Sequence, residues 1–256
     1  MMFQSVPASK ATLSVAALNA LTAACGRCGR TDVAVSLMND MPSKYGVTPD
    51  ERTYRSVIIA CNQAEHEKQR QNYVKKISAS DDDFDDDEED DDLFELQWWE
   101  CALSLFRRMQ EDKLSPDVQT YSSVISCCQA AGQWQRAIGV LQSMIKEIER
   151  QNNVSSESAS SLNLFCCNAA IAACEKGGAW IEALSLYEII KSNDKIEPNF
   201  VTINSVLMAL DEAGQKELAG EIYSEALQNR IISPWKYRRE YFGGSEIEER
   251  IRVLVC

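Results

Sequence analysis

The chain has 256 residues, 45% of them hydrophobic, which is enough to build one large domain or two small ones. Its formal net charge of −13 is local, because 11 of its 39 acidic residues lie in positions 81–92 and the other 28 nearly balance 26 lysines and arginines, so charge neither favours nor excludes a polyanionic partner. No 18 consecutive residues are apolar, which predicts no transmembrane helix and no membrane partner.

The N-terminal residues 1–14 are predicted to be a leader. They contain one lysine, no acidic residue and no apolar block of the signal-peptide type. This composition is compatible with a short organellar presequence.

The first repeat, residues 15–50, introduces a pattern that recurs along the chain. The stretch VAALNALTAACGRCGRTDVAVSLMNDM, from Val15, aligns without a gap with stretches from Val118, Leu164 and Phe200. The four stretches share a glycine (Gly29, Gly132, Gly178 and Gly214) and, five residues later, an alanine (Ala34, Ala137, Ala183 and Ala219). Self-similarity at a fixed period is the signature of a repeat architecture.

Each repeat is predicted to be a pair of helices. In residues 164–199, apolar residues from Cys167 to Cys174 follow the spacing i, i+3, i+4, i+7 of one helical face. Gly178 interrupts this face, and a second apolar stripe begins at Trp180. The recurrent alanine is expected where the two helices approach most closely.

The acidic run lies inside the second repeat, residues 51–117. Residues 51–64 match a first helix, and residues 97–117 match a second helix with Ala102 at the alanine position. Residues 65–96 are therefore predicted to be a disordered insertion within one repeat. A contiguous acidic run repels itself, which favours a solvated loop over a two-metal nuclease site.

The remaining repeats are residues 118–163, 164–199 and 200–235. Residues 152–163 are serine-rich and are predicted to be a second disordered insertion. Residues 236–256 leave the pattern and are predicted to form a C-terminal cap or extension, because the last repeat of an array needs one.

The cysteines are predicted to be packing residues. Four of them, Cys25, Cys61, Cys128 and Cys174, occupy the same position in four consecutive repeats. This phase is typical of buried thiols in a reducing compartment. The Cys25–Cys28 pair is a CxxC motif without a second pair of ligands, so no metal site is expected.

Three tryptophans open second helices and are expected to be packing anchors: Trp99, Trp134 and Trp180.

The repeats resemble the pentatricopeptide repeat (PPR) family. The period of 35 or 36 residues and the endings TPD, SPD and EPN carry the resemblance, most clearly in TPDERTYRSVIIAC, SPDVQTYSSVISCC and CNAAIAACEKGGAWIEALSLYE. The tetratricopeptide repeat is the nearest rival, but its period is 34 residues. The resemblance implies an all-α fold, a right-handed α-solenoid of about five helix-turn-helix PPR units with an acidic insertion in the second.

PPR proteins bind single-stranded RNA, mostly in mitochondria and plastids and typically with one base per repeat. The resemblance therefore implies that the partner is single-stranded RNA, an organellar transcript. It also implies location in a mitochondrion or chloroplast and a role in RNA processing, stability or translation. The alternative is a protein–protein interaction scaffold, in which the same groove binds a peptide or helix of a protein partner.

In this family two residues of each repeat read most of the base: a polar residue in the first turn of the first helix and the last residue of the repeat. The corresponding pairs are Asn19 with Asp50, Arg55 with Asp117, Ser122 with Asn163, Asn168 with Asn199, and Asn204 with Trp235. Phe165 and Val201, three residues before Asn168 and Asn204, suit the face of a base. The predicted RNA-binding residues are Asn19, Asp50, Ser122, Asn163, Phe165, Asn168, Asn199, Val201 and Asn204.

Arg55 and Trp235 do not fit the usual base code of the family. No serine–histidine–aspartate set or glycine-rich phosphate loop is present. We therefore predict no enzymatic activity, no cofactor, no metal and no small-molecule substrate. Protein-only RNase P joins PPR units to a nuclease domain, and no such domain is expected here.

Overall fold

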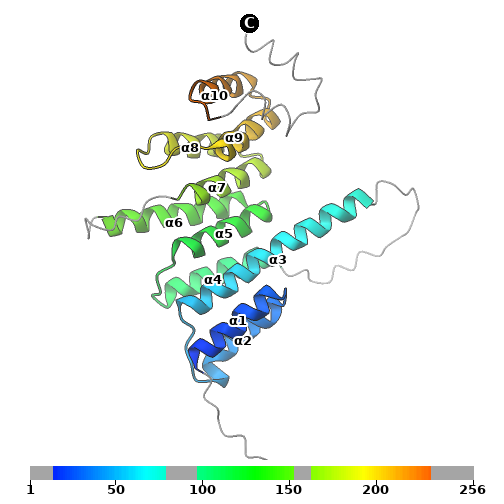
Figure 1. The fold of residues 1–256 in the computed structure, drawn as a ribbon, viewed down its shortest axis with the longest axis vertical. Coiled ribbons are helices and arrows are strands. Elements are labelled where there is room, and N and C mark those ends of the chain that lie inside the picture. The colour runs from blue at the N-terminus through cyan, green and yellow to red at the C-terminus, as the bar shows by residue number, and fades with distance from the viewer. Residues whose placement is uncertain (1–13, 79–96, 153–162, 232–256) are drawn as a thin grey trace, which may run out of the picture. The chain divides into compact units, whose positions relative to one another are not determined.

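The computed structural model describes residues 14–78, 97–152 and 163–231, which form ten helices and no strand (Figure 1). The helices are α1 (Val15–Arg27), α2 (Thr31–Lys44), α3 (Glu51–Ser78), α4 (Trp98–Glu111), α5 (Val118–Ala130), α6 (Trp134–Asn152), α7 (Leu164–Lys176), α8 (Trp180–Lys191), α9 (Phe200–Glu212) and α10 (Lys216–Gln228). They follow the predicted order of two helices per repeat. The chain divides into two compact halves, Met1–Cys127 and Cys128–Cys256, with the division inside α5.

In the N-terminal half, α3 packs against α1, α2 and α4. The core is apolar, with Leu18, Met38 and Tyr54 fully buried. Burying one large apolar side chain of this kind stabilises a fold by about 1.5–3 kcal/mol. Helices α1 and α3 approach closely at Gly26, where an added Cβ would lie 2.8 Å from the Cβ of Ala60. Glycine thus lets α1 and α3 approach more closely than alanine would.

In the C-terminal half, α7 is the central helix and packs against α6, α8 and α9. Its C-terminal end, at Gly177, lies against the indole of Trp134, the first residue of α6. This contact supports the prediction that Trp134 is a packing anchor between neighbouring repeats.

The recurrent glycines lie in the turn between the two helices of a repeat. Gly29, Gly132, Gly178 and Gly214 have φ between 66° and 72°. This left-handed conformation costs a glycine little and strains most other residues, which accounts for the recurrence.

The recurrent alanines are mostly buried, as a small residue at a helix contact would be. Ala34, Ala102, Ala137 and Ala183 have no exposed surface, whereas Ala219 is half-buried.

The cysteines that recur at one position of the repeat are also largely buried. Cys61, Cys128 and Cys174 are buried and Cys25 is half-buried, and no cluster able to hold a metal occurs among the described residues.

The prediction that disorder begins at residue 65 is wrong. Helix α3 continues to Ser78, so that its 28 residues span about 42 Å, and it projects past α1 and α2 (Figure 1). The extension contains no glycine or proline, and Glu67 pairs with Arg70 across one turn at 2.9 Å. These local preferences allow a helix where no apolar stripe predicts one.

The acidic run and most of the second predicted insertion lie outside the described residues, as do the leader up to residue 13 and the cap at 236–256. The predicted insertion at 152–163 is too wide at both ends, because Asn152 ends α6 and Asn163 caps α7. None of the helices in the described ranges has the length and hydropathy that crossing a bilayer requires.

Candidate nucleic-acid interface

The last residue of a repeat lies directly before the first helix of the next. Asp50, Asp117, Asn163 and Asn199 precede α3, α5, α7 and α9. Each accepts a hydrogen bond from a backbone N–H of that helix, as an N-cap residue does. Because α1 packs against α3 and α7 against α9, a polar residue near the start of one first helix comes close to the cap of the next.

The structure brings Asn19 and Asp50 together. The amide Nδ2 of Asn19 lies 3.0 and 3.1 Å from the two carboxylate oxygens of Asp50. The hydroxyl of Thr53 donates to Asn19 Oδ1, and the Thr53 N–H donates to Asp50 Oδ1 at 2.8 Å. Burial alone would raise the pKa of Asp50, but the hydrogen bonds from Thr53 and Asn19 outweigh it and lower the pKa. This repeat therefore presents a carboxylate beside an amide.

The same arrangement recurs at Asn168 and Asn199. Asn168 Nδ2 donates to Asn199 Oδ1 at 3.2 Å, and the hydroxyl of Thr202 donates to Asn168 Oδ1 at 2.7 Å. Asn199 and Thr202 form a capping box at the start of α9. Each amide oxygen has two lone pairs and each amide nitrogen two protons, so Asn168 keeps one acceptor site and one donor for a base edge.

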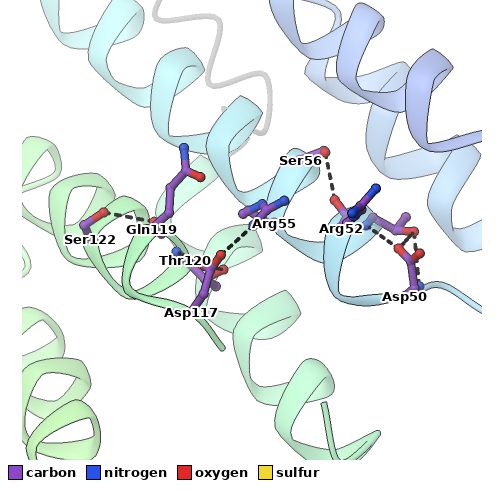
Figure 2. A network of polar contacts seen from close by, with 9 residues as sticks. Asp50, Arg52, Arg55, Ser56, Asp117, Gln119, Thr120 and Ser122 are labelled. Atoms are coloured by element: carbon purple, nitrogen blue, oxygen red, sulfur yellow. Dashed lines mark hydrogen bonds and ion pairs between the residues drawn. The ribbon is translucent and has the colours of Figure 1, made fainter. Parts of the chain in front are cut away.

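Arg55 and Asp117 form an ion pair instead (Figure 2), with Arg55 Nη1 2.5 Å from Asp117 Oδ2. The other carboxylate oxygen, Oδ1, accepts bonds from the backbone and the hydroxyl of Thr120. Burial raises the pKa of Asp117 less than Thr120 and Arg55 lower it, so the carboxylate stays charged. The groups that would read a base are thus already bonded to each other.

Ser122 and Asn163 lie in different halves and each bonds locally. The Ser122 hydroxyl donates to the backbone oxygen of Gln119 at 2.9 Å, and Asn163 Oδ1 accepts from the Phe165 N–H at 2.7 Å. Trp235, the predicted partner of Asn204, lies outside the described residues.

Asn204 is only 8% exposed and has an unsatisfied amide. Its Nδ2 lies 3.4 Å from the sulfur of Met208, and its Oδ1 is buried without a hydrogen-bond partner. A buried polar atom of this kind costs stability unless a ligand or another group meets it.

Phe165 and Val201 are the second residues of α7 and α9. Their side chains are 61% and 51% exposed, one turn before Asn168 and Asn204. Arg52 and Gln119 occupy the same position in the second and third repeats and are also exposed. Two neighbouring first helices therefore expose an apolar side chain one turn before an asparagine that is itself largely buried.

The far ends of these two helices are acidic. Burial raises the pKa of Glu175, at the end of α7, and the nearby charge of Glu212 at the end of α9 acts in the same direction against a hydrogen bond from Ser205. The exposed side chains of Asp211 and Glu212 disfavour phosphates here, which places more of any RNA affinity on contacts to bases.

Sequence reasoning missed the roles of Thr53 and Thr202. A signal was present, since a threonine follows the last residue of three repeats at a distance of three: Asp50–Thr53, Asp117–Thr120 and Asn199–Thr202. This spacing is typical of a capping motif, but the bond to the preceding repeat depends on how the helices pack.

The comparisons with protein families address the repeats directly. The pentatricopeptide repeat domain family matches residues 100–148, and the PPR repeat family matches residues 16–45 and 165–194. The chain contains pentatricopeptide repeats. No curated protein matches the sequence.

Solved PPR structures share the fold. Nuclear proteinaceous RNase P 2 (PRORP2) from A. thaliana aligns with a TM-score of 0.60 and 16% identity, over 93% of this chain and 41% of its own. The PPR domain of A. thaliana protein-only RNase P 1 (PRORP1), solved in complex with tRNA, aligns with a TM-score of 0.59 and 12% identity, over 94% and 99%. This chain thus spans about two fifths of the PRORP2 chain. The predicted fold class, an all-α solenoid of PPR hairpins, is confirmed.

Proposed function

We propose that this PPR protein binds single-stranded RNA and holds one base per repeat along its first helices. One observation carries the proposal: the neighbouring helices α7 and α9 each expose an apolar side chain, Phe165 or Val201, one turn before an asparagine with hydrogen-bonding capacity to spare. Single-stranded RNA is recognised by this combination, because its unstacked bases need an apolar face and a donor–acceptor pair for the edge.

The PPR repeats and the tRNA complex of the PRORP1 PPR domain support RNA as the ligand class. We propose that the chain acts without catalysis, by covering an RNA site or recruiting another factor in organellar RNA processing, stability or translation. The resemblance to the PPR family supports this proposed role. Imaging of the tagged full-length protein in cells, with mitochondrial and plastid markers, tests the location.

The binding test uses a random pool of single-stranded RNA at one fixed salt concentration. The wild type should enrich sequences with a preference at two adjacent bases. The double change Asn168→Ala with Asn204→Ala should remove that preference, because a good bidentate contact contributes about 1–3 kcal/mol of discrimination at one base.

Asn229→Ala is the matched control, since Asn229 is exposed and follows the C-terminal end of α10, the second helix of its repeat. It should leave the enriched sequences unchanged. If the wild type enriches nothing but captures a protein from organellar extract, the RNA proposal fails and the scaffold alternative replaces it.

A further inference from the structure

The amide of a base-reading asparagine is useful only if its oxygen and nitrogen stay in fixed places. An amide that rotates by 180° exchanges a donor for an acceptor, and the base preference changes with it. In Asn168 the orientation is fixed from the next repeat. The Thr202 hydroxyl lies 2.7 Å from Asn168 Oδ1, and Asn199 Oδ1 lies 3.2 Å from Asn168 Nδ2.

Thr202 controls both of these contacts. Its single hydroxyl proton has two acceptors within reach, Asn168 Oδ1 at 2.7 Å and Asn199 Oδ1 at 3.1 Å, and the nearer is Asn168. Its backbone N–H donates to Asn199 Oδ1 at 3.1 Å, which fixes that oxygen as the acceptor facing Asn168 Nδ2. Thr202 itself has no exposed surface, so solvent does not compete for the hydroxyl.

The same device occurs in the N-terminal half. Thr53 has no exposed surface, donates from its hydroxyl to Asn19 Oδ1 and from its N–H to Asp50 Oδ1. Its recurrence in two repeats of different sequence indicates a shared role beyond capping one helix.

In two other repeats, one member of this threonine–asparagine pair is missing. The Thr120 N–H donates to Asp117 in the same way. The first-helix residue paired with Asp117 is Arg55, however, and its guanidinium has no acceptor atom. The Thr120 hydroxyl therefore bonds to Asp117 itself, at 2.7 Å. Asn204 has the amide but, among the described residues, no threonine hydroxyl bonded to its Oδ1. Its Oδ1 is left without a partner.

We propose that Thr202 and Thr53 are positioning residues for base reading: the threonine hydroxyl of one repeat locks the asparagine amide of the preceding repeat. The base preference of a repeat is therefore set partly by its successor. This inference rests on the proposed RNA-binding function, and the test below separates the two.

The test uses the full chain and three variants. Thr202→Val keeps the side-chain shape and removes the hydroxyl, and Thr202→Ser retains the hydroxyl. Thr120→Val is the matched control, because it removes an equivalent capping hydroxyl that contacts no amide of the preceding repeat. Both valine variants should lose similar thermal stability.

The first readout needs no RNA. The side-chain NH₂ signals of Asn168, assigned by their loss in Asn168→Ala, are followed by NMR. They should move, and exchange faster with water, in Thr202→Val but stay in place in Thr120→Val and Thr202→Ser. Unchanged Asn168 signals in Thr202→Val overturn the inference, whatever the RNA result.

The second readout is selection from the random single-stranded RNA pool. At the base whose preference Asn168→Ala removes, Thr202→Val should lower discrimination about tenfold, while Thr202→Ser and Thr120→Val should stay within about twofold of wild type. Equal effects of the two valine variants overturn the inference. A wild type that enriches no sequence overturns the proposed function, and the NMR readout then still decides whether Thr202 fixes Asn168.

Discussion

Replacing Gly177 with alanine should destabilise the contact between α6 and α7. Gly177 follows the last residue of α7, with φ −90° and ψ 3°, a conformation that alanine also adopts. The backbone is therefore not the obstacle. The obstacle is Trp134, because an added Cβ would lie 2.1 Å from its Cδ1 and 2.9 Å from its Cγ. These atoms belong to a rigid ring, so the whole indole must shift.

The expected change in the free energy of unfolding combines two opposing effects. Overpacking a close contact costs about 1–3 kcal/mol. Replacing glycine with alanine at a permitted conformation restricts the unfolded chain, which stabilises the folded state by about 0.4–1 kcal/mol. The expected net loss in the free energy of unfolding is about 1–2 kcal/mol.

Urea denaturation followed by circular dichroism measures this loss, and hydrogen exchange locates it. Protection should fall in α6 and α7, since each repeat of a solenoid contacts only its neighbours. Gly139→Ala is the control. An added Cβ there meets nothing within 4 Å, and the change in mid-helix should stabilise by about 0.5–1 kcal/mol. The reasoning is refuted if Gly177→Ala is as stable as Gly139→Ala, or if Trp134→Leu does not relieve the loss.

Two further predictions concern Ala183 and Asp50. Ala183→Leu should cost about 1–3 kcal/mol, because Ala183 has no exposed surface between α7 and α8, and hydrogen exchange should show the loss there and not in α1. The lowered pKa of Asp50 means that it stabilises the fold above its ordinary value of 3.8 and that this contribution disappears as the pH falls through the lower, folded-state value. An NMR titration of the Asp50 carboxyl carbon should give a midpoint below 3.8, and Asp50→Asn should make the loss of stability in acid smaller; a midpoint at or above 3.8 contradicts this.

The sequence was sufficient for the features that repeat with the period. The turn glycines, the buried alanines and the position of each last residue before the next helix all follow from alignment of the chain with itself. The extension of α3 could not be predicted in this way. Its residues 65–78 are mostly polar, so the helix has no apolar stripe there and periodicity gives no signal.

Contacts between repeats also could not be predicted from the sequence. The bond from Thr202 to Asn168 joins residues 34 positions apart, and the packing of Trp134 on Gly177 joins α6 to α7. Each depends on the distance between neighbouring helices, which side-chain volumes set together and no single motif encodes.

Under the proposed function, the ion pair of Arg55 and Asp117 limits how much of an RNA sequence the array can recognise. A repeat whose two base-reading groups are bonded to each other would act as a spacer and divide the recognised sequence into short segments. The longest uninterrupted segment in the C-terminal half would be the two bases read by Asn168 and Asn204, and any given two-base sequence recurs about once in sixteen nucleotides of random sequence. Such a protein would select a transcript by the spacing between recognised segments as well as by the bases within each segment.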